Sequence, residues 1–305
     1  MPTRPSILYV SNLAYPAKGR RYCDEDIYLT SNLRQHFDVA ITHPEDAAAL
    51  MPGYDAVVVR NSGPVIDYPA AYEAFRSQAI ATGQRVYNPL TGKADMAGKQ
   101  YMIDLTTEGY PVIPTIDDLA NLDRLTLDGT DPERATYVTK PKAGADSHGL
   151  EFHTRESLEN RETLLSDRET AGQPSGDTAQ IPGGVGRIPG DTLIQPKIDF
   201  RYEVSFYFVD RDFQYALHAP DPAQRWELTL YSPSGDDLEF AEKFIAWNDL
   251  PHGVQRVDAC RTRSGDLLLV ELEDLNPYLS LDRTTDAVRT RFVEAMTTSL
   301  RSSLA

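Results

Sequence analysis

The chain has 305 residues and a formal net charge of −16 at pH 7, from 30 Lys and Arg against 46 Asp and Glu. With 41% hydrophobic and 25% charged residues it has a globular composition, long enough for about two or three domains. The acidic balance argues against a nucleic-acid or anionic-membrane surface, because phosphate backbones are held by clustered Lys and Arg. It leaves room for a small anionic ligand, which needs only a few local cations and a metal ion.

The sequence shows no pattern typical of export, membrane insertion or a cysteine-based metal site. The N-terminal residues show no long apolar segment followed by a small-residue cleavage site, and no apolar run approaches the ~18–20 residues of a membrane-spanning helix. Cys23 and Cys260 have no metal-like spacing and are expected to be reduced. We therefore expect a cytoplasmic protein without nucleic-acid or membrane partners.

The N-terminal part of the chain alternates short β-rich runs with segments of helical periodicity. This rhythm predicts a parallel sheet flanked by helices, and no GxGxxG turn follows the first strand. The expected strands are 6–11, 38–42, 56–59 and 85–87, and the expected helices are 24–37 and 72–81.

The rest of the chain is expected to be mostly strands. A helix over 95–107 is followed by strand-forming runs and then by a Gly-, Pro- and Ser-rich segment, 165–191, which is typical of a lid or a disordered insert. A final amphipathic helix is expected over 284–304. The strand-forming runs are 137–140, 144–149, 151–153, 192–195, 202–209, 214–218, 226–231, 256–260 and 267–271.

A first candidate site follows the run that ends at Lys140. The next residues include Gly144, Ser147 and Gly149, and glycines allow the backbone N–H groups of a loop to approach a phosphate closely. Lys140 would add a positive charge, although the GxxxxGK[ST] pattern is absent. By itself this pattern fits a phosphate-binding loop or an ordinary surface hairpin.

A second candidate site consists of carboxylates near the C-terminal strands. Glu271 and Glu273 stand two apart on an expected strand, so both point to one face, and Asp258 lies on the strand before it. Converging carboxylates repel one another unless cations neutralise them, and hard oxygen ligands suit Mg²⁺ or Mn²⁺. The alternative is a solvated acidic edge, but the apolar run 267–270 favours a buried strand.

A third candidate site is an apolar strand that runs into a polar hinge, with Gln195, Lys197 and Ile198. Such a hinge could place backbone groups against a purine, and Glu203 could accept hydrogen bonds from ribose hydroxyls. From the residues alone, Glu203 is equally well an ordinary strand carboxylate.

The order of these features resembles the ATP-grasp superfamily of carboxylate–amine ligases. Lys99 precedes the Lys140 loop, the hinge, Glu203, Arg256-x-Asp258 and Glu271-x-Glu273. The resemblance extends over about residues 85–282 and includes the D-alanine ligases, the glutathione synthetases and the branch with the cyclo-ligase that forms D-cycloserine. It implies an α/β and α+β ATP-grasp fold behind a Rossmann-like N-terminal domain.

The resemblance also implies roles for individual residues. The implied ATP contacts are phosphate binding by Lys99, Lys140 and the Gly144–Gly149 loop, adenine binding by Gln195, Lys197 and Ile198, and ribose binding by Glu203. The implied ligands of two Mg²⁺ ions are Asp258, Glu271 and Glu273, and the implied oxyanion-binding residue is Arg256. The related enzymes usually carry Asn where this chain has Glu273, so Asn276 is an alternative third metal ligand.

Substrate residues are less determined by the pattern. Arg60 follows the third expected strand, where ligands of open α/β sheets bind, and could either clamp a carboxylate or cap a surface turn. Tyr278 and Ser280 follow the acidic strand and could line the acceptor pocket.

The sequence therefore predicts three domains: 1–92 for substrate, 93–194 with the phosphate loop and the 165–191 insert, and 195–305 with the metal site. The implied reaction forms an acyl phosphate from ATP and a small amino-acid-like carboxylate, which an amine then attacks to form an amide or related C–N bond. Secondary or amino-acid metabolism is the expected setting, and a homodimer is possible. The alternatives are an intramolecular cyclo-ligase and a non-catalytic ATP-binding regulatory module.

Overall fold

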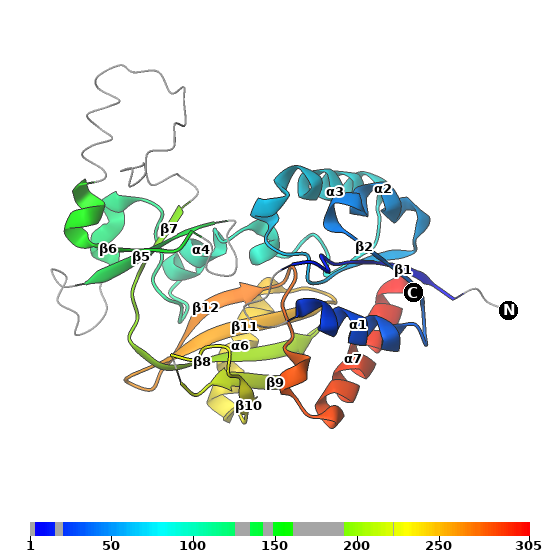
Figure 1. Cartoon of the computed structure of the whole chain (residues 1–305). Helices are drawn as coiled ribbons and strands as arrows, with labels where there is room; N and C mark the ends of the chain where they lie inside the picture. Colours follow the sequence, from blue (N-terminus) through cyan, green and yellow to red (C-terminus); the bar gives the residue numbers. More distant parts are fainter. Residues whose placement is uncertain (1–3, 16–20, 126–134, 143–148, 161–191, 222) are drawn as a thin grey trace, which may run out of the picture. The chain divides into compact units, whose positions relative to one another are not determined.

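The computed structural model describes residues 4–15, 21–125, 135–142, 149–160, 192–221 and 223–305 (Figure 1). The chain divides into two compact units, Met1–Tyr101 with Asp199–Ala305, and Met102–Ile198. The predicted domains 1–92 and 195–305 belong mostly to the first of these units. Their division into separate functional domains, with boundaries at 92 and 194, stays a prediction.

The N-terminal half of the first unit is built on a parallel sheet, as predicted. Its strand order is β2-β1-β3-β4. The strands are β1 (Ser6–Val10), β2 (Asp38–Thr42), β3 (Ala56–Val59) and β4 (Val86–Tyr87), and the helices between them are α1 (Tyr22–Leu33), α2 (Ala47–Leu50) and α3 (Pro69–Thr82).

Alternating side chains of this sheet enter two different cores. On β1, Leu8 and Val10 pack in a cluster with Phe75 and Ala79 of α3. Ile7 and Tyr9 point the other way and join a larger cluster, because successive strand residues face opposite sides. Helices α2 and α3 therefore cover one face and α1 covers the other (Figure 1).

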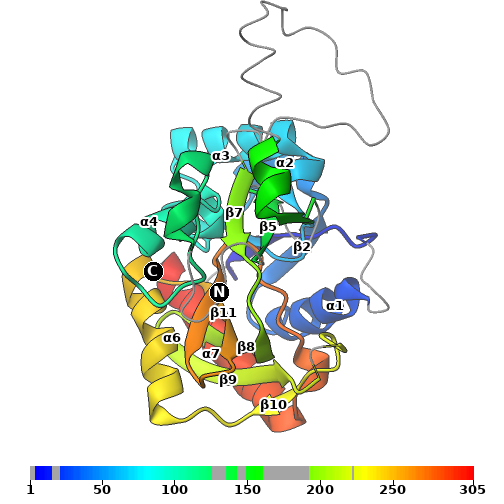
Figure 2. The ribbon, with the colours of Figure 1, turned by 90° about the vertical axis from the view of Figure 1, so that its left-hand side faces the viewer.

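The C-terminal half of the same unit is an antiparallel sheet with the order β10-β9-β8-β11-β12. Helix α6 contacts β11 and β12, whereas α7 contacts β8 and β9 and shares the larger core with α1 (Figure 2). The strands are β8 (Phe200–Val209), β9 (Asp212–Ala219), β10 (Thr229–Tyr231), β11 (Val254–Thr262) and β12 (Leu267–Glu273), and the helices are α6 (Gly235–Asn248) and α7 (Asp286–Leu304).

Two expectations about this unit were wrong. Only strands were expected between 192 and 271, and helix α6 was not predicted, although Ser234 and Asp237 form a capping box at its start, which is a helix signal visible in the sequence. The helix expected over 95–107 is interrupted: a 3-10 turn, Asp95–Ala97, and a turn containing Lys99 precede α4 (Tyr101–Thr107). Gly98 has φ +86°, which no α-helix accepts.

The second unit has a three-stranded antiparallel sheet of order β6-β5-β7, with β5 (Thr136–Pro141), β6 (Glu151–Thr154) and β7 (Thr192–Pro196). Its small core includes Tyr137, Leu158 and Ile194. Gly149 has φ +74°, and a Cβ there would lie 2.8 Å from Pro141 Cγ, so this position favours glycine.

Some predicted features lie outside the described residues, namely most of the Gly144–Gly149 loop and the 165–191 insert. In the described ranges, Cys23 and Cys260 are free thiols, as expected. No helix within those ranges is long and apolar enough to cross a bilayer.

Candidate active site

The predicted acidic residues and Arg256 meet on one face of the antiparallel sheet. Strand register places Arg256 directly opposite Glu273, and Asp258 opposite Glu271. On the other side of β11, Ser205 of β8 lies opposite Asp258. The thirteen-residue step from Asp258 to Glu271 is therefore the length of a hairpin that returns to place two carboxylates side by side.

Arg256 contacts several groups on this face of the sheet. Its guanidinium makes bidentate contact with Asp258, at 3.0 Å from Nε to Oδ1 and 2.8 Å from Nη2 to Oδ2. The same Nη2 donates to Glu273 Oε1 at 2.5 Å, and Nη1 donates to the Tyr278 carbonyl at 2.7 Å. Asp258 also accepts a hydrogen bond from Ser205 Oγ at 2.6 Å. Such charge-assisted contacts fix the direction of the guanidinium.

A residue that the sequence analysis did not single out, Asp95, completes a carboxylate cluster. Among the described residues, Asp95, Glu271 and Glu273 can each offer an oxygen, and these oxygens all lie within 4.8 Å of one another. The Lys99 ammonium contacts Glu271 Oε1 and lies 3.6 Å from Asp95 Oδ2. The cluster thus contains Glu271 and Glu273 as predicted, whereas Asp258 is directed at Arg256.

Burial and repulsion shift the protonation of this cluster. Burial raises the pKa of Glu273 to about 8, with Arg256 opposing the shift and the charge of Glu271 adding to it. Burial likewise raises the pKa of Asp95, against the attraction of Lys99. Burial acts to lower the pKa of Lys99, but the charges of Asp95 and Glu271 outweigh it and raise that pKa. Additional positive charge would therefore be stabilised here.

The segment that carries Asp95 and Lys99 is anchored by Asp274, the residue after Glu273. Asp274 is fully buried, and its carboxylate accepts from the Met96 N–H at 2.7 Å and from the Ala94 N–H at 3.3 Å. Asn248 Nδ2 donates to the same carboxylate at 3.0 Å. These bonds link the 3-10 turn to the end of β12.

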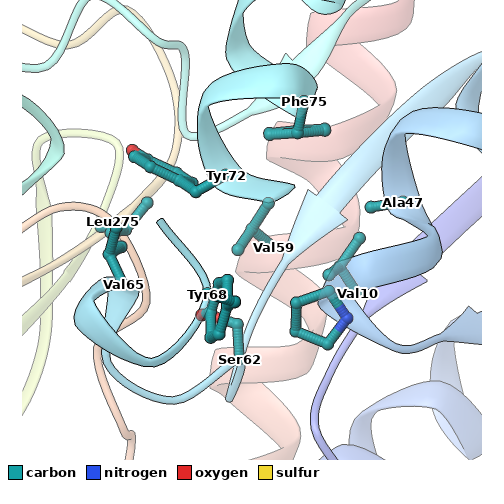
Figure 3. A pocket seen from close by; sticks show the side chains of 10 residues that line it. Val10, Ala47, Val59, Ser62, Val65, Tyr68, Tyr72, Phe75 and Leu275 are labelled. Carbon is teal, nitrogen blue, oxygen red and sulfur yellow. The ribbon is translucent and has the colours of Figure 1, made fainter. Parts of the chain in front are cut away.

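Asn276, the alternative metal ligand, is directed elsewhere. Its Nδ2 donates to Ser62 Oγ at 2.8 Å and to the Gly63 carbonyl at 3.1 Å. Ser62 lines a small apolar pocket at the carboxyl ends of β1 and β3, together with Tyr68 and Tyr72 (Figure 3). This pocket has a volume of only about 20 Å³.

Arg60, expected either to clamp a substrate carboxylate or to cap a surface turn, is only 1% exposed. Its Nη2 donates to the Pro277 carbonyl and lies 3.6 Å from Glu25 Oε1. Tyr278 stacks on Tyr22, with ring centroids 4.1 Å apart, and faces a cavity of about 520 Å³ that Glu25 also lines. Ser280 is buried with φ +51°.

Glu25 should make stability depend on pH. Its carboxylate is buried, accepts from the Leu279 N–H at 3.0 Å, and has a pKa raised by burial to about 7 from the ordinary 4.5. A raised pKa stabilises the fold below pH ~4.5, and this contribution is lost as the pH rises through ~7. Glu25→Gln has no ionisable group at this position and lacks this dependence. As the pH rises from ~5 to ~8, we therefore expect the free energy of unfolding of Glu25→Gln to increase by about 2–3 kcal/mol relative to that of wild type.

Urea unfolding at both pH values measures this difference. The matched control is Asp24→Asn, since the neighbouring Asp24 side chain is 61% exposed. A Glu25→Gln difference that stays constant across the range would contradict the assignment.

The predicted nucleotide residues of the second unit lie on and after two paired strands. Lys140 is on β5 opposite Leu193, and Gln195 is buried and donates from Nε2 to Thr115 Oγ1 at 2.8 Å. Lys197 lies over the Phe152 ring, 5.7 Å from its centroid, and Ile198 is half-buried. Gly144 and Ser147 fall outside the described residues.

Glu203, the predicted ribose ligand, lies on β8 in the first unit. It forms an ion pair with Arg225, whose Nε donates to Glu203 Oε2 at 2.8 Å. Burial raises the pKa of Glu203, and Arg225 opposes that shift. A ligand hydroxyl that reaches Glu203 would therefore meet a carboxylate already oriented by Arg225.

Sequence reasoning missed Asp95, Asp274, Ser205 and Arg225. The four-residue step from Asp95 to Lys99 was the one local signal, because residues at that spacing often form ion pairs on a helix. The other three depend on strand pairing and loop return, which the linear sequence does not display.

The comparisons with known proteins agree with the predicted resemblance. No protein-family model matches the sequence. The chain is 24% identical over 285 residues to the cycloserine biosynthesis protein DcsG of Streptomyces lavendulae, covering 84% of this chain and 87% of that protein. The crystal structure of the D-cycloserine synthetase DcsG superposes with a TM-score of 0.68 at 21% identity, over 96% of this chain and 99% of that one.

Two further solved structures have the same fold. The D-alanine–D-alanine ligase of Bacillus anthracis, complexed with ATP, gives a TM-score of 0.60 at 14% identity, over 98% of this chain and 97% of the ligase. The ATP-grasp ligase PsnB, complexed with a minimal precursor, Mg and ADP, gives 0.56 at 16% identity, over 97% and 99% of the two chains. The chain has the fold of the ATP-grasp ligases.

Proposed function

We propose that this protein is an ATP-dependent carboxylate–amine ligase of secondary metabolism. It activates a small amino-acid-like carboxylate as an acyl phosphate, releasing ADP, and joins it to an amine. The observation that carries the proposal is the meeting of Lys99, Arg256 and the Asp95–Glu271–Glu273 carboxylates on one sheet face of an ATP-grasp fold.

The carboxylate cluster fits a divalent cation. Its three oxygen donors are of the kind that Mg²⁺ prefers, and Asp95 Oδ1 is buried without a hydrogen-bond partner among the described residues. Glu271 and Glu273 would hold Mg²⁺, which would neutralise charge on the phosphates of ATP. The proposed second ion, with Asp258, rests on the resemblance, and the same hard oxygen donors would also accept Mn²⁺.

Arg256 is suited to stabilise developing negative charge. Its guanidinium is held from several sides, so it meets a tetrahedral oxyanion without having to reorient. Lys99 and Lys140 would bind phosphates as point charges, and the Gln195–Ile198 hinge would contact the adenine. Arg60, Tyr278 and Ser280 are proposed on the substrate side, Arg60 acting through Glu25 and the chain at Pro277.

A hydroxylamine trap tests the proposal. The protein is incubated with Mg-ATP, hydroxylamine and a panel of amino acids and small carboxylic acids, and both ADP and hydroxamate are measured. Hydroxamate with one acid is the expected result, because hydroxylamine captures an acyl phosphate and thereby names the activated substrate. Absence of ADP with every acid would contradict the proposal and favour a non-catalytic ATP-binding module.

Cyclisation within one substrate is the second candidate. The likeness to a D-cycloserine synthetase over 96% of the chain favours it. In that case the activated carboxyl and the nucleophile belong to one molecule, so the trap should give ADP and a cyclic product with little hydroxamate. Mass spectrometry of the product separates the two reactions.

Glu203 provides a test of the nucleotide-binding assignment. We expect Glu203→Ala to weaken ATP binding about tenfold, because two ribose hydroxyls would lose a charged acceptor. Calorimetric titration with a non-hydrolysable ATP analogue measures the change. Arg225→Ala is the companion variant, which removes the ion-pair partner and keeps the carboxylate. Unchanged affinity in Glu203→Ala would exclude this role.

A homodimer and a cytoplasmic location complete the proposal. Sedimentation equilibrium at several protein concentrations measures the oligomeric state directly.

A further inference from the structure

Lys99 lies against the carboxylates of the proposed metal site. The lysine is 5% exposed, its ammonium contacts Glu271, and Asp95 Oδ2 lies 3.6 Å away. Both carboxylates belong to the cluster whose oxygens lie within 4.8 Å of one another. The ammonium therefore neutralises Glu271, one of the two carboxylates that would ligate a divalent cation, and lies beside Asp95.

The two cations of this face divide the carboxylates between them. Arg256 contacts Glu273 at 2.5 Å and is fixed by Asp258, whereas Lys99 contacts Glu271. A divalent ion on Glu271 and Glu273 would repel a neighbouring ammonium strongly, because charges in a buried site are poorly screened by water. Lys99 has a flexible four-carbon stem and can move, whereas the guanidinium is held in a fork.

Asp95 is placed to receive the displaced ammonium. Its neighbours Ala94 and Met96 both donate backbone N–H groups to the buried Asp274 carboxylate, which fixes the turn. Its Oδ1 is buried and has no hydrogen-bond partner in the part of the chain that the structure describes. A small rotation of the Lys99 stem would replace the contact with Glu271 by a closer contact with Asp95.

We propose that Lys99 occupies the cation position of this site until a divalent ion displaces it, and that Asp95 is the positioning residue that then holds the ammonium. The inference rests on the proposed function, since it assigns the order of events at the proposed metal site. The binding step breaks the contact between Lys99 and Glu271 and strengthens the contact between Lys99 and Asp95. Lys99 then stays close to the site for binding a phosphate.

A double-mutant cycle with Mn²⁺ tests this inference. Electron paramagnetic resonance measures free Mn²⁺ during titration of the nucleotide-free protein, for wild type, Lys99→Met, Asp95→Asn and the double variant. We expect Lys99→Met to bind Mn²⁺ about tenfold more tightly, because the competing ammonium is gone. We expect Asp95→Asn to weaken binding about tenfold with Lys99 present, and to change it less than about twofold with Met at position 99.

Controls separate displacement from general charge and folding effects. Lys93→Met removes the same charge from the same segment, at a side chain that donates to the Trp247 carbonyl, and should leave Mn²⁺ binding within about twofold. Lys99→Gln repeats the removal with a polar side chain, so the result does not depend on how Met packs. Circular dichroism checks that each variant is folded.

Two outcomes would overturn the inference. If neither Lys99→Met nor Lys99→Gln tightens Mn²⁺ binding, the ammonium does not compete with the ion. If Asp95→Asn weakens binding equally with and without Lys99, Asp95 ligates the ion directly. If the wild-type protein forms hydroxamate in the hydroxylamine trap, either of these results contradicts only the present inference. If the wild-type protein forms no ADP, the proposed function itself is contradicted.

Discussion

Arg256→Ala should reduce turnover by about 10²–10³-fold, while the affinity for Mg-ATP changes less than about threefold. The guanidinium is held in one orientation by Asp258, Glu273 and the Tyr278 carbonyl. Its loss removes the donors that would meet the oxyanion of the tetrahedral intermediate. Calorimetry with a non-hydrolysable ATP analogue and steady-state ADP release measure the two quantities separately.

Arg261→Ala is the matched control for this prediction. Arg261 lies on the same strand, β11, but contacts Asp237 and Tyr231 rather than the carboxylate cluster. It should lower stability without a comparable loss of turnover. Equal loss of nucleotide binding and turnover in Arg256→Ala would instead assign Arg256 a structural role.

Asp274→Asn should lower the free energy of unfolding by about 2–4 kcal/mol. The wild-type carboxylate accepts from the backbone of Met96 and Ala94 and from Asn248, so an amide NH₂ at either oxygen position would face a donor. The same change loosens the turn that carries Asp95 and Lys99. We therefore also expect weaker Mg-ATP binding, by about tenfold.

Urea unfolding and calorimetry measure the two effects of Asp274→Asn. Asp266→Asn, in the exposed turn between β11 and β12, is the control and should be nearly neutral for both. A destabilised variant with unchanged Mg-ATP affinity would show that the anchor serves folding alone. Gly92 belongs to the same anchor, because a Cβ there would collide with the Asp274 carboxylate.

The carboxylate site shows which features can be predicted from local sequence pattern and which cannot. Glu271 and Glu273 could be assigned to one face because the side-chain period of a strand is two, and the structure places both in the cluster. Asp258 was expected beside them, and strand register indeed sets it opposite Glu271, but its oxygens are directed at Arg256 and Ser205. The direction of a side chain depends on its partners across the sheet.

The contacts of Arg60 and Asn276 could not be predicted from local sequence pattern. Both types of residue are mostly exposed in proteins. Arg60 was expected either to clamp a carboxylate or to cap a surface turn, and Asn276 was the alternative metal ligand. Arg60 is buried against the chain at Pro277, and Asn276 donates to the loop at Ser62. These contacts join residues more than 200 positions apart, which no local pattern can predict.

The sequence by itself determined the parallel sheet, most strands of the antiparallel sheet and the resemblance to ATP-grasp ligases, because hydrophobic periodicity and motif order are local properties. The tertiary structure alone decided that Asp95 joins the carboxylate cluster, that Lys99 contacts Glu271, and that Asp274 holds the turn between them. Those contacts depend on a loop from the N-terminal half returning to the end of β12. Their energies come from burial and charge, which exist only once the chain has folded.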